Sequence, residues 1–142
     1  MDTQNLIETA FEARRNSYSP YSHYRVGAAL LCDDGSVVKG CNIENASYSA
    51  TICAERSAVF AAVSAGKRCF KALAIAGGNE DEDYVTSDYA YPCGICRQVL
   101  REFTDPGSFT IIVARSIEDY KDFTLEQLLP DSFGPDNLKQ EK

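Results

Sequence analysis

Residues 53–78 read CAERSAVFAAVSAGKRCFKALAIAGG, a helix pattern followed closely by a strand pattern. Apolar residues recur at helical spacing from Cys53 to Ala65, and Gly66 is placed to close the helix. The wholly apolar run Ala72–Ala76 predicts a strand buried on both faces. A helix that leads into such a strand is typical of a sheet covered by helices, so this stretch indicates the α/β class.

The flanking sequence continues the alternation of helices and strands. The other predicted helices are residues 3–16, residues 93–103 and a short helix opened by the capping box 124–127. The other predicted strands are residues 24–32, 37–42 and 109–114, with a weaker one near Tyr120. Asp33-Asp34-Gly35 predicts a hairpin turn between the first two strands. Together these elements indicate a mixed sheet covered by helices.

Length and charge narrow the possible functions. The 142 residues suit a single domain, 1–142. The net charge of −7 and the scattered Lys and Arg disfavour a nucleic-acid partner, because such partners are usually bound by a basic face. The sequence has neither a long apolar run nor the start of a signal peptide, so we expect no membrane association and a cytoplasmic location, with the nucleus as an alternative.

Three of the six cysteines form a pattern suited to a metal ion. Cys53 begins the helix quoted above, and Pro92-Cys93-Gly94-Ile95-Cys96 begins another. Three thiolates can hold zinc and leave its fourth position open, as in catalytic sites, whereas structural sites commonly use four ligands. A structural zinc knuckle is the disfavoured alternative. The remaining Cys32, Cys41 and Cys69 lack ligand spacing, and we expect them to be buried as small apolar residues.

Two charged residues follow Cys53 closely. Glu55 is placed to act on whatever fills the open metal position, although a glutamate in a first helical turn is also favourable for the helix dipole alone. Arg56 lies three residues after Cys53 and therefore on the same helical face. We expect its guanidinium to donate to a ligand sulfur and withdraw charge from the anionic metal complex.

The combination of these motifs resembles the zinc-dependent nucleoside and nucleobase deaminases, and more narrowly the small homotetrameric cytidine deaminases. The match rests on Cys53-Ala54-Glu55-Arg56 and on residues 92–98, and it extends to residues 18–29, 40–48 and 132–135. The resemblance implies a three-layer α/β/α fold with a mixed five-stranded sheet. It also implies hydrolytic deamination of free cytidine and deoxycytidine to uridine and deoxyuridine, in pyrimidine salvage.

The resemblance assigns the residues of the reaction. It implies that Cys53, Cys93 and Cys96 hold one Zn²⁺ per subunit, that this ion activates a water, and that the resulting hydroxide attacks C4 of cytosine. It further implies that Glu55 shuttles protons and helps ammonia leave, and that the N–H of Ala54 lies near the attacked carbon. This is the general mechanism of zinc-dependent base deaminases.

The resemblance also assigns the substrate contacts. Asn42 and Glu44 are expected to bind the ribose 3′-hydroxyl. Tyr24 replaces the usual phenylalanine that packs on the pyrimidine. Phe133 is expected to reach the site of a neighbouring subunit in a homotetramer, so that each site is completed by other chains.

Two rival functions share parts of this pattern. A polynucleotide cytosine deaminase would use the same metal site, but the net charge and the sugar-binding pair disfavour it. A non-catalytic zinc module serving assembly would keep the cysteines without needing Glu55. The sequence does not decide between ribose and deoxyribose.

Overall fold

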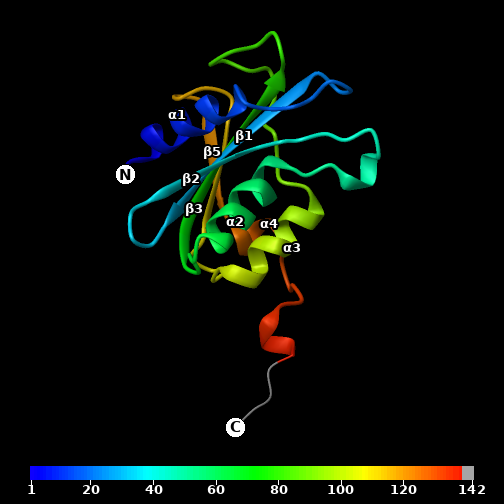
Figure 1. Ribbon diagram of the computed structural model, residues 1–142. Coiled ribbons are helices and arrows are strands. Elements are labelled where there is room, and N and C mark those ends of the chain that lie inside the picture. Colours follow the sequence, from blue (N-terminus) through cyan, green and yellow to red (C-terminus); the bar gives the residue numbers. More distant parts are fainter. Residues whose placement is uncertain (139–142) are drawn as a thin grey trace.

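The computed structural model describes residues 1–138, and its centre is a mixed five-stranded sheet (Figure 1). The sheet order is β2-β1-β3-β4-β5. Among these strands β3 and β4 run parallel, while the β1–β2, β1–β3 and β4–β5 pairs are antiparallel. The predicted mixed sheet is therefore confirmed. The strands are β1 (Tyr24–Cys32), β2 (Val37–Cys41), β3 (Phe70–Asn79), β4 (Thr110–Ala114) and β5 (Tyr120–Thr124).

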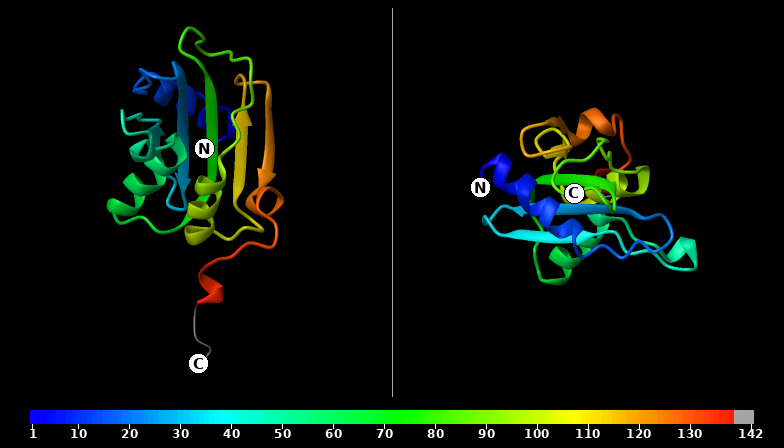
Figure 2. Two further views of the ribbon diagram at one scale, coloured as in Figure 1. Left: turned by 90° about the vertical axis from the view of Figure 1, so that its right-hand side faces the viewer. Right: turned by 90° about the horizontal axis from the view of Figure 1, so that it is seen from above.

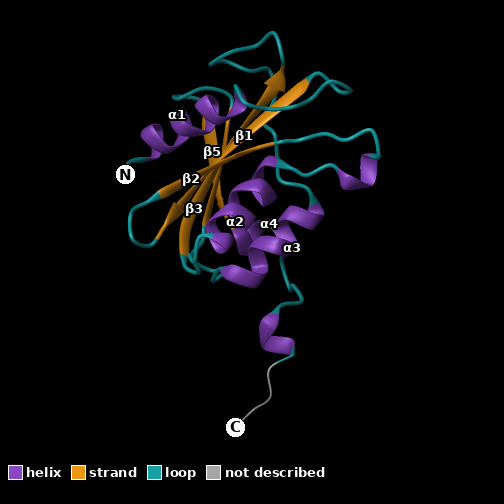
Figure 3. Cartoon of the chain, in the orientation of Figure 1, coloured by secondary structure: helices purple, strands orange, loops and turns teal. Residues whose placement is uncertain are grey.

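Helices cover both faces of the sheet, which gives three layers (Figure 2). One face is covered by α1 (Thr3–Arg14), and the other by α2 (Ala54–Ser64), α3 (Gly94–Phe103) and the short α4 (Leu125–Leu128) (Figure 3). The single-turn 3-10 helices η1 (Tyr48–Ala50) and η2 (Pro135–Asn137) lie outside these layers. The three-layer α/β/α arrangement predicted for the fold is thus confirmed. None of the helices within residues 1–138 has the length and apolar character needed to cross a membrane.

Each layer of helices has its own core. On one face, Leu6, Ile7 and Phe11 of α1 pack against small residues of the sheet such as Ala29 and Ala74. On the other face, larger side chains of β1, β3 and β4 pack against α2 and α3. Side chains alternate between the two faces of a strand, so each central strand contributes to both cores.

Gly40 of β2 lets α2 lie directly on the sheet. A Cβ atom at this position would lie 2.4 Å from Ala58 N and 2.5 Å from Ala54 O, which is too close for packed atoms. The backbone of β2 therefore touches the backbone of α2. This contact fixes the first turn of α2, and with it Cys53 and Glu55, relative to the sheet.

The third strand is longer than the predicted run 72–76. Gly77 and Gly78, the predicted end of that strand, pair with Val26 and Arg25 of β1. The long neighbouring strand supplies hydrogen-bond partners, so β3 continues to Asn79 although glycine is unfavourable in strands.

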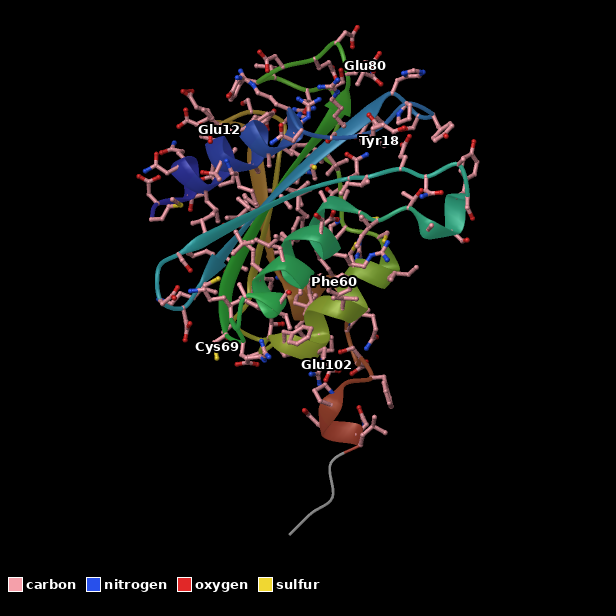
Figure 4. All side chains as sticks on the ribbon, in the orientation of Figure 1. Glu12, Tyr18, Phe60, Cys69, Glu80 and Glu102 are labelled. Atoms are coloured by element: carbon pink, nitrogen blue, oxygen red, sulfur yellow. The ribbon has the colours of Figure 1, made fainter. Side chains whose placement is uncertain are left out.

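The cysteines outside the motif differ in exposure, which corrects the expectation that all three are buried. Cys32 is buried, Cys41 is half-buried, and Cys69 is exposed at the edge of the molecule (Figure 4). Cys69 directly precedes Phe70, which is buried in the core. Neighbouring side chains at a strand end point in opposite directions, so the cysteine turns toward solvent.

Candidate metal centre and substrate cleft

The three motif cysteines lie where two helices begin. Cys53 is the N-cap of α2, Cys93 is the N-cap of α3, and Cys96 lies in the first turn of α3. Neither N-cap cysteine uses its side chain to cap its own helix, so both sulfurs remain available to a ligand. Backbone N–H groups at a helix start favour nearby negative charge, which stabilises the thiolate form.

The three sulfur atoms form a compact cluster. Cys53 Sγ lies 3.8 Å from Cys93 Sγ, and Cys93 Sγ lies 3.5 Å from Cys96 Sγ. All three lie within 4.8 Å of one another. Tetrahedral zinc with Zn–S bonds of about 2.3 Å separates its sulfur ligands by about 3.8 Å. The donor set and its spacing therefore fit zinc, and three protein ligands leave a fourth position free.

Arg56 lies beside this cluster. Its Nη2 donates to Cys53 Sγ at 3.3 Å. Hydrogen bonds from Cys96 and from Arg56 lower the pKa of the Cys53 thiol to about 5. The guanidinium therefore lies where its positive charge can partly neutralise the negative charge of the thiolate sulfur.

Glu55 is buried next to the cysteines. Its side chain comes from the first turn of α2, and only 5% of the residue is exposed. Burial raises the pKa of Glu55 to about 7. Ala54, the first residue of α2, is also fully buried, and its N–H is one of those without a partner inside the helix.

A cleft of about 330 Å³ opens beside the cluster, within the usual range of small-molecule sites. Its metal end is lined by Cys53, Ala54, Glu55 and Cys93. The rest of the wall comes from the start of β1 and from the segments that enter the two metal-bearing helices. These residues are Tyr24, Val26, Asn42, Thr51, Ile52, Ala90 and Tyr91.

Five of these lining residues are missing from the sequence-based prediction. Thr51 and Ile52 directly precede Cys53, and Ala90 and Tyr91 precede Pro92-Cys93. Their closeness to the metal ligands along the chain is a signal that would have identified them. Val26 is two residues after Tyr24 on β1, and residues two apart on a strand share a face.

Asn42 lies in the cleft wall, but its side chain also holds the start of β1. Its Oδ1 accepts from Val26 N at 2.9 Å, and its Nδ2 donates to Tyr24 O at 2.8 Å. One N–H of the amide remains for a ligand. Asn42 therefore sets the backbone position of Tyr24 and Val26, two other residues of the wall.

Glu44 lies in an adjoining hollow of about 360 Å³ rather than in the cleft itself. Tyr21, Ser22, Tyr48 and Thr51 also line this hollow, and Thr51 lines the cleft as well. The Glu44 carboxylate accepts from Tyr21 N at 3.0 Å, from Ser22 N at 3.1 Å and from Ser22 Oγ. The structure thus places the predicted sugar-binding pair in two hollows that meet at Thr51.

Phe133 lies outside the cleft of its own chain. It is not among the cleft-lining residues within the described part of the chain, and 58% of it is exposed. The segment that carries it leads into η2, which projects away from the body of the fold beyond α3 (Figure 1).

Sequence comparison identifies the family to which this site belongs. The family model described as the cytidine and deoxycytidylate deaminase zinc-binding region matches residues 1–111. The chain belongs to this family. The zinc-binding region of the family includes all three clustered cysteines, which identifies zinc as the cofactor of this deaminase-family chain.

Similar proteins cover nearly the whole length of the chain. A cytidine deaminase of Sporosarcina psychrophila is 45% identical over 138 residues, which is 97% of this chain and 96% of that protein. A cytidine deaminase of Mycobacterium tuberculosis H37Rv is 40% identical over 142 residues, which is 100% of this chain and 97% of that protein. The crystal structure of the cytidine deaminase from Burkholderia pseudomallei has a TM-score of 0.84 and 42% identity, with coverage of 94% of this chain and 100% of that chain.

Proposed function

We propose that this protein hydrolyses the 4-amino group of free cytidine and deoxycytidine, which releases ammonia and leaves uridine or deoxyuridine. One observation carries the proposal. A buried carboxyl group, Glu55, lies in the same cleft wall as a three-cysteine cluster whose spacing fits zinc. The family membership and the names of the similar proteins agree with this activity.

The chain's own residues supply the metal ligands and the proton transfers. Cys53, Cys93 and Cys96 would hold zinc, which when bound lowers the pKa of water and so provides a nucleophile for C4 of the cytosine ring. Glu55 takes one proton from the attacking water and passes it to N3 of the ring. The carboxyl then transfers the second water proton to the departing amino group, so that ammonia leaves and the C4 carbonyl forms. Arg56 keeps its hydrogen bond to the Cys53 sulfur during these proton transfers.

The charges around the cleft favour a nucleoside over a nucleotide or a polynucleotide. Among residues 1–138, the lining of the cleft and of the adjoining hollow contains no Lys, Arg or His. It contains two carboxyl groups, those of Glu55 and Glu44. Within this lining a 5′-phosphate would have no cation to pair with it, which is unfavourable in a desolvated site.

In the proposed complex, residues of the cleft and of the adjoining hollow contact both the base and the sugar of the nucleoside. The Tyr24 ring packs on the pyrimidine, and Asn42 and Glu44 bind the sugar hydroxyl from two sides of Thr51. The exposed Phe133 supports assembly as a homotetramer in which a neighbouring chain completes each cleft. Buried sugar hydroxyls need paired polar groups, so the polar groups at Asn42 and Glu44 suit a nucleoside.

Zinc analysis combined with an ultraviolet assay of cytidine loss tests the proposal. We expect one zinc per chain and turnover of cytidine and deoxycytidine. Cytidine 5′-monophosphate and a cytosine-containing oligonucleotide should react at least about a hundredfold more slowly, as expected for about 3 kcal/mol of unfavourable phosphate placement. A zinc-loaded protein that releases no ammonia from cytidine would refute the assignment and favour a non-catalytic zinc module. Faster turnover of the oligonucleotide than of cytidine would favour a polynucleotide cytosine deaminase.

A further inference from the structure

The helix that carries two of the metal-ligand cysteines also anchors the C-terminal segment. Gln98 Nε2 on α3 donates to Phe133 O at 3.0 Å. One turn later, Arg101 Nε donates to Ser132 Oγ at 2.9 Å, and Arg101 Nη2 lies 3.3 Å from Asp136 Oδ2. These contacts hold the Phe133 carbonyl and the side chains of Ser132 and Asp136, on both sides of Phe133, against α3. The position of the segment is therefore fixed relative to the helix that holds the metal site.

Arg101 is built into the fold rather than lying on its surface. Only 9% of the residue is exposed, which is unusual for a charged side chain unless it is paired. Gly134 lies directly over its guanidinium, because a Cβ at that position would lie 2.4 Å from Arg101 Cζ. The backbone of Gly134 is extended, with φ of −158°, so the requirement for glycine here is space and not conformation. The segment therefore lies flat on the guanidinium.

The ring of Phe133 does not share in this burial. Its carbonyl and both neighbouring residues are held, yet 58% of Phe133 is exposed. An exposed apolar ring, held in place by the buried Arg101 and by Gln98, contributes nothing to its own chain's core, where its burial would contribute about 2–3 kcal/mol. The arrangement is what a contact with another copy of the chain requires, because it removes the cost of ordering the segment on binding.

We propose that Arg101, assisted by Gln98, is a positioning residue for the reaction and presents Phe133 to the nucleoside cleft of a neighbouring copy. This inference rests on the proposed function, since it requires a cleft that another chain completes. The ring of Phe133 packs on the bound nucleoside, and Arg101 acts only through that ring. Losing Arg101 should therefore weaken substrate binding without changing the chemical step.

A double-mutant cycle tests this role with steady-state kinetics on cytidine. Phe133→Ala should raise KM about tenfold with kcat within about twofold, as expected when uniform binding is lost. Arg101→Met keeps the packing of the side chain but removes the guanidinium, and should raise KM about threefold to fivefold. The double variant should have the KM of Phe133→Ala alone, because Arg101 has no target once the ring is gone.

Two further variants check the interpretation. Gly134→Ala removes no polar group but pushes the segment off Arg101, so it should raise KM like Arg101→Met. Arg115→Met is the matched control, because Arg115 is paired with Asp119 and is not part of the tail contacts. We expect unchanged KM in this control, and zinc content and sedimentation like the wild type in all variants.

Specific results would overturn the inference. These are an unchanged KM in Arg101→Met, KM effects that multiply in the double variant, or an unchanged KM in Phe133→Ala although the wild type is active. Dissociation of the Arg101→Met assembly while Phe133→Ala stays assembled would show that Arg101 serves assembly instead. Failure of the proposed function is distinguished from these results, because it appears as a zinc-loaded wild type that leaves cytidine unchanged.

Discussion

The metal end of the cleft and its rim are assembled in different ways. The metal end consists of Cys53, Ala54, Glu55 and Cys93. These residues and the third cysteine of the cluster, Cys96, come from the first turns or caps of two helices. Spacing along a helix start sets where these groups point. Each half of this end is therefore determined by a few consecutive residues, and the fold has only to bring two helix starts together.

The rim is built from separate segments. We use this name for Tyr24, Asn42, Glu44, Thr51 and Tyr91. These residues come from the start of β1 and from loops before or after other elements. The side chains of Asn42 and Glu44 are hydrogen-bonded to the backbone of segments distant in sequence. The chemistry therefore depends on local helix geometry, whereas recognition depends on strand register. Changes at the metal end should therefore lower kcat, and changes at the rim should raise KM.

The largest effect is expected for Glu55→Gln at the metal end. The amide keeps the shape of the side chain but cannot carry the proton between water, ring and leaving group. We expect kcat to fall by about 10³-fold, within the range of general acid–base catalysis. The measurement is ammonia release from saturating cytidine.

Retention of zinc separates this effect from loss of the site. The variant should bind zinc and unfold as the wild type does, and Glu8→Gln on the exposed side of α1 is the matched control with full activity. If Glu55→Gln kept full turnover, the metal end would not be the place of the chemistry.

A smaller loss at the same end is expected for Arg56→Gln. This change removes the donor that contacts Cys53 Sγ at 3.3 Å. Loss of a hydrogen bond to a metal-ligand side chain typically lowers activity or metal affinity by about 10–100-fold. We therefore expect kcat to fall by about tenfold. Zinc stoichiometry and kcat are measured together. Arg68→Gln is the control, because Arg68 donates only to the carbonyls of Val63 and Lys67. Turnover equal to that of the wild type would remove Arg56 from the mechanism.

At the rim, Asn42→Asp tests whether recognition and strand position are coupled. The new carboxylate would face Tyr24 O in place of an N–H donor, so we expect about 1–3 kcal/mol of lost stability in urea unfolding. Because the same amide positions Tyr24 and Val26, KM should rise with little change in kcat. Asn5→Asp on α1 is the control and should affect neither quantity. A loss of stability without any rise in KM would show that Asn42 holds the start of β1 but does not contribute to substrate binding.

The same contrast explains what could be predicted from sequence. The spacing of Cys93 and Cys96 and the capping box at Thr124 are local signals, and they give the helix starts directly. The extension of β3 through Gly77 depends on its pairing with Val26, which local propensity does not contain. Likewise, the anchoring of Asn42 depends on a strand 16 residues earlier. Non-local pairing therefore limits the prediction of where β3 ends and of what Asn42 anchors.

The smallest effect is expected for Tyr24→Phe, which removes one hydroxyl group from the rim. Burial and then the negative charge of Asp88 raise the pKa of Tyr24, so the phenol stays neutral at physiological pH. Tyrosine and phenylalanine present the same ring face to a pyrimidine, and packing on that face depends on the ring. KM should therefore change by less than about threefold, and kcat should not change. Steady-state kinetics on cytidine and deoxycytidine measure both constants, and Tyr120→Phe on β5 is the control. A change in KM of tenfold or more would show that the hydroxyl contacts the substrate, in which case recognition at the rim would depend on a polar group as well as on the ring that β1 positions.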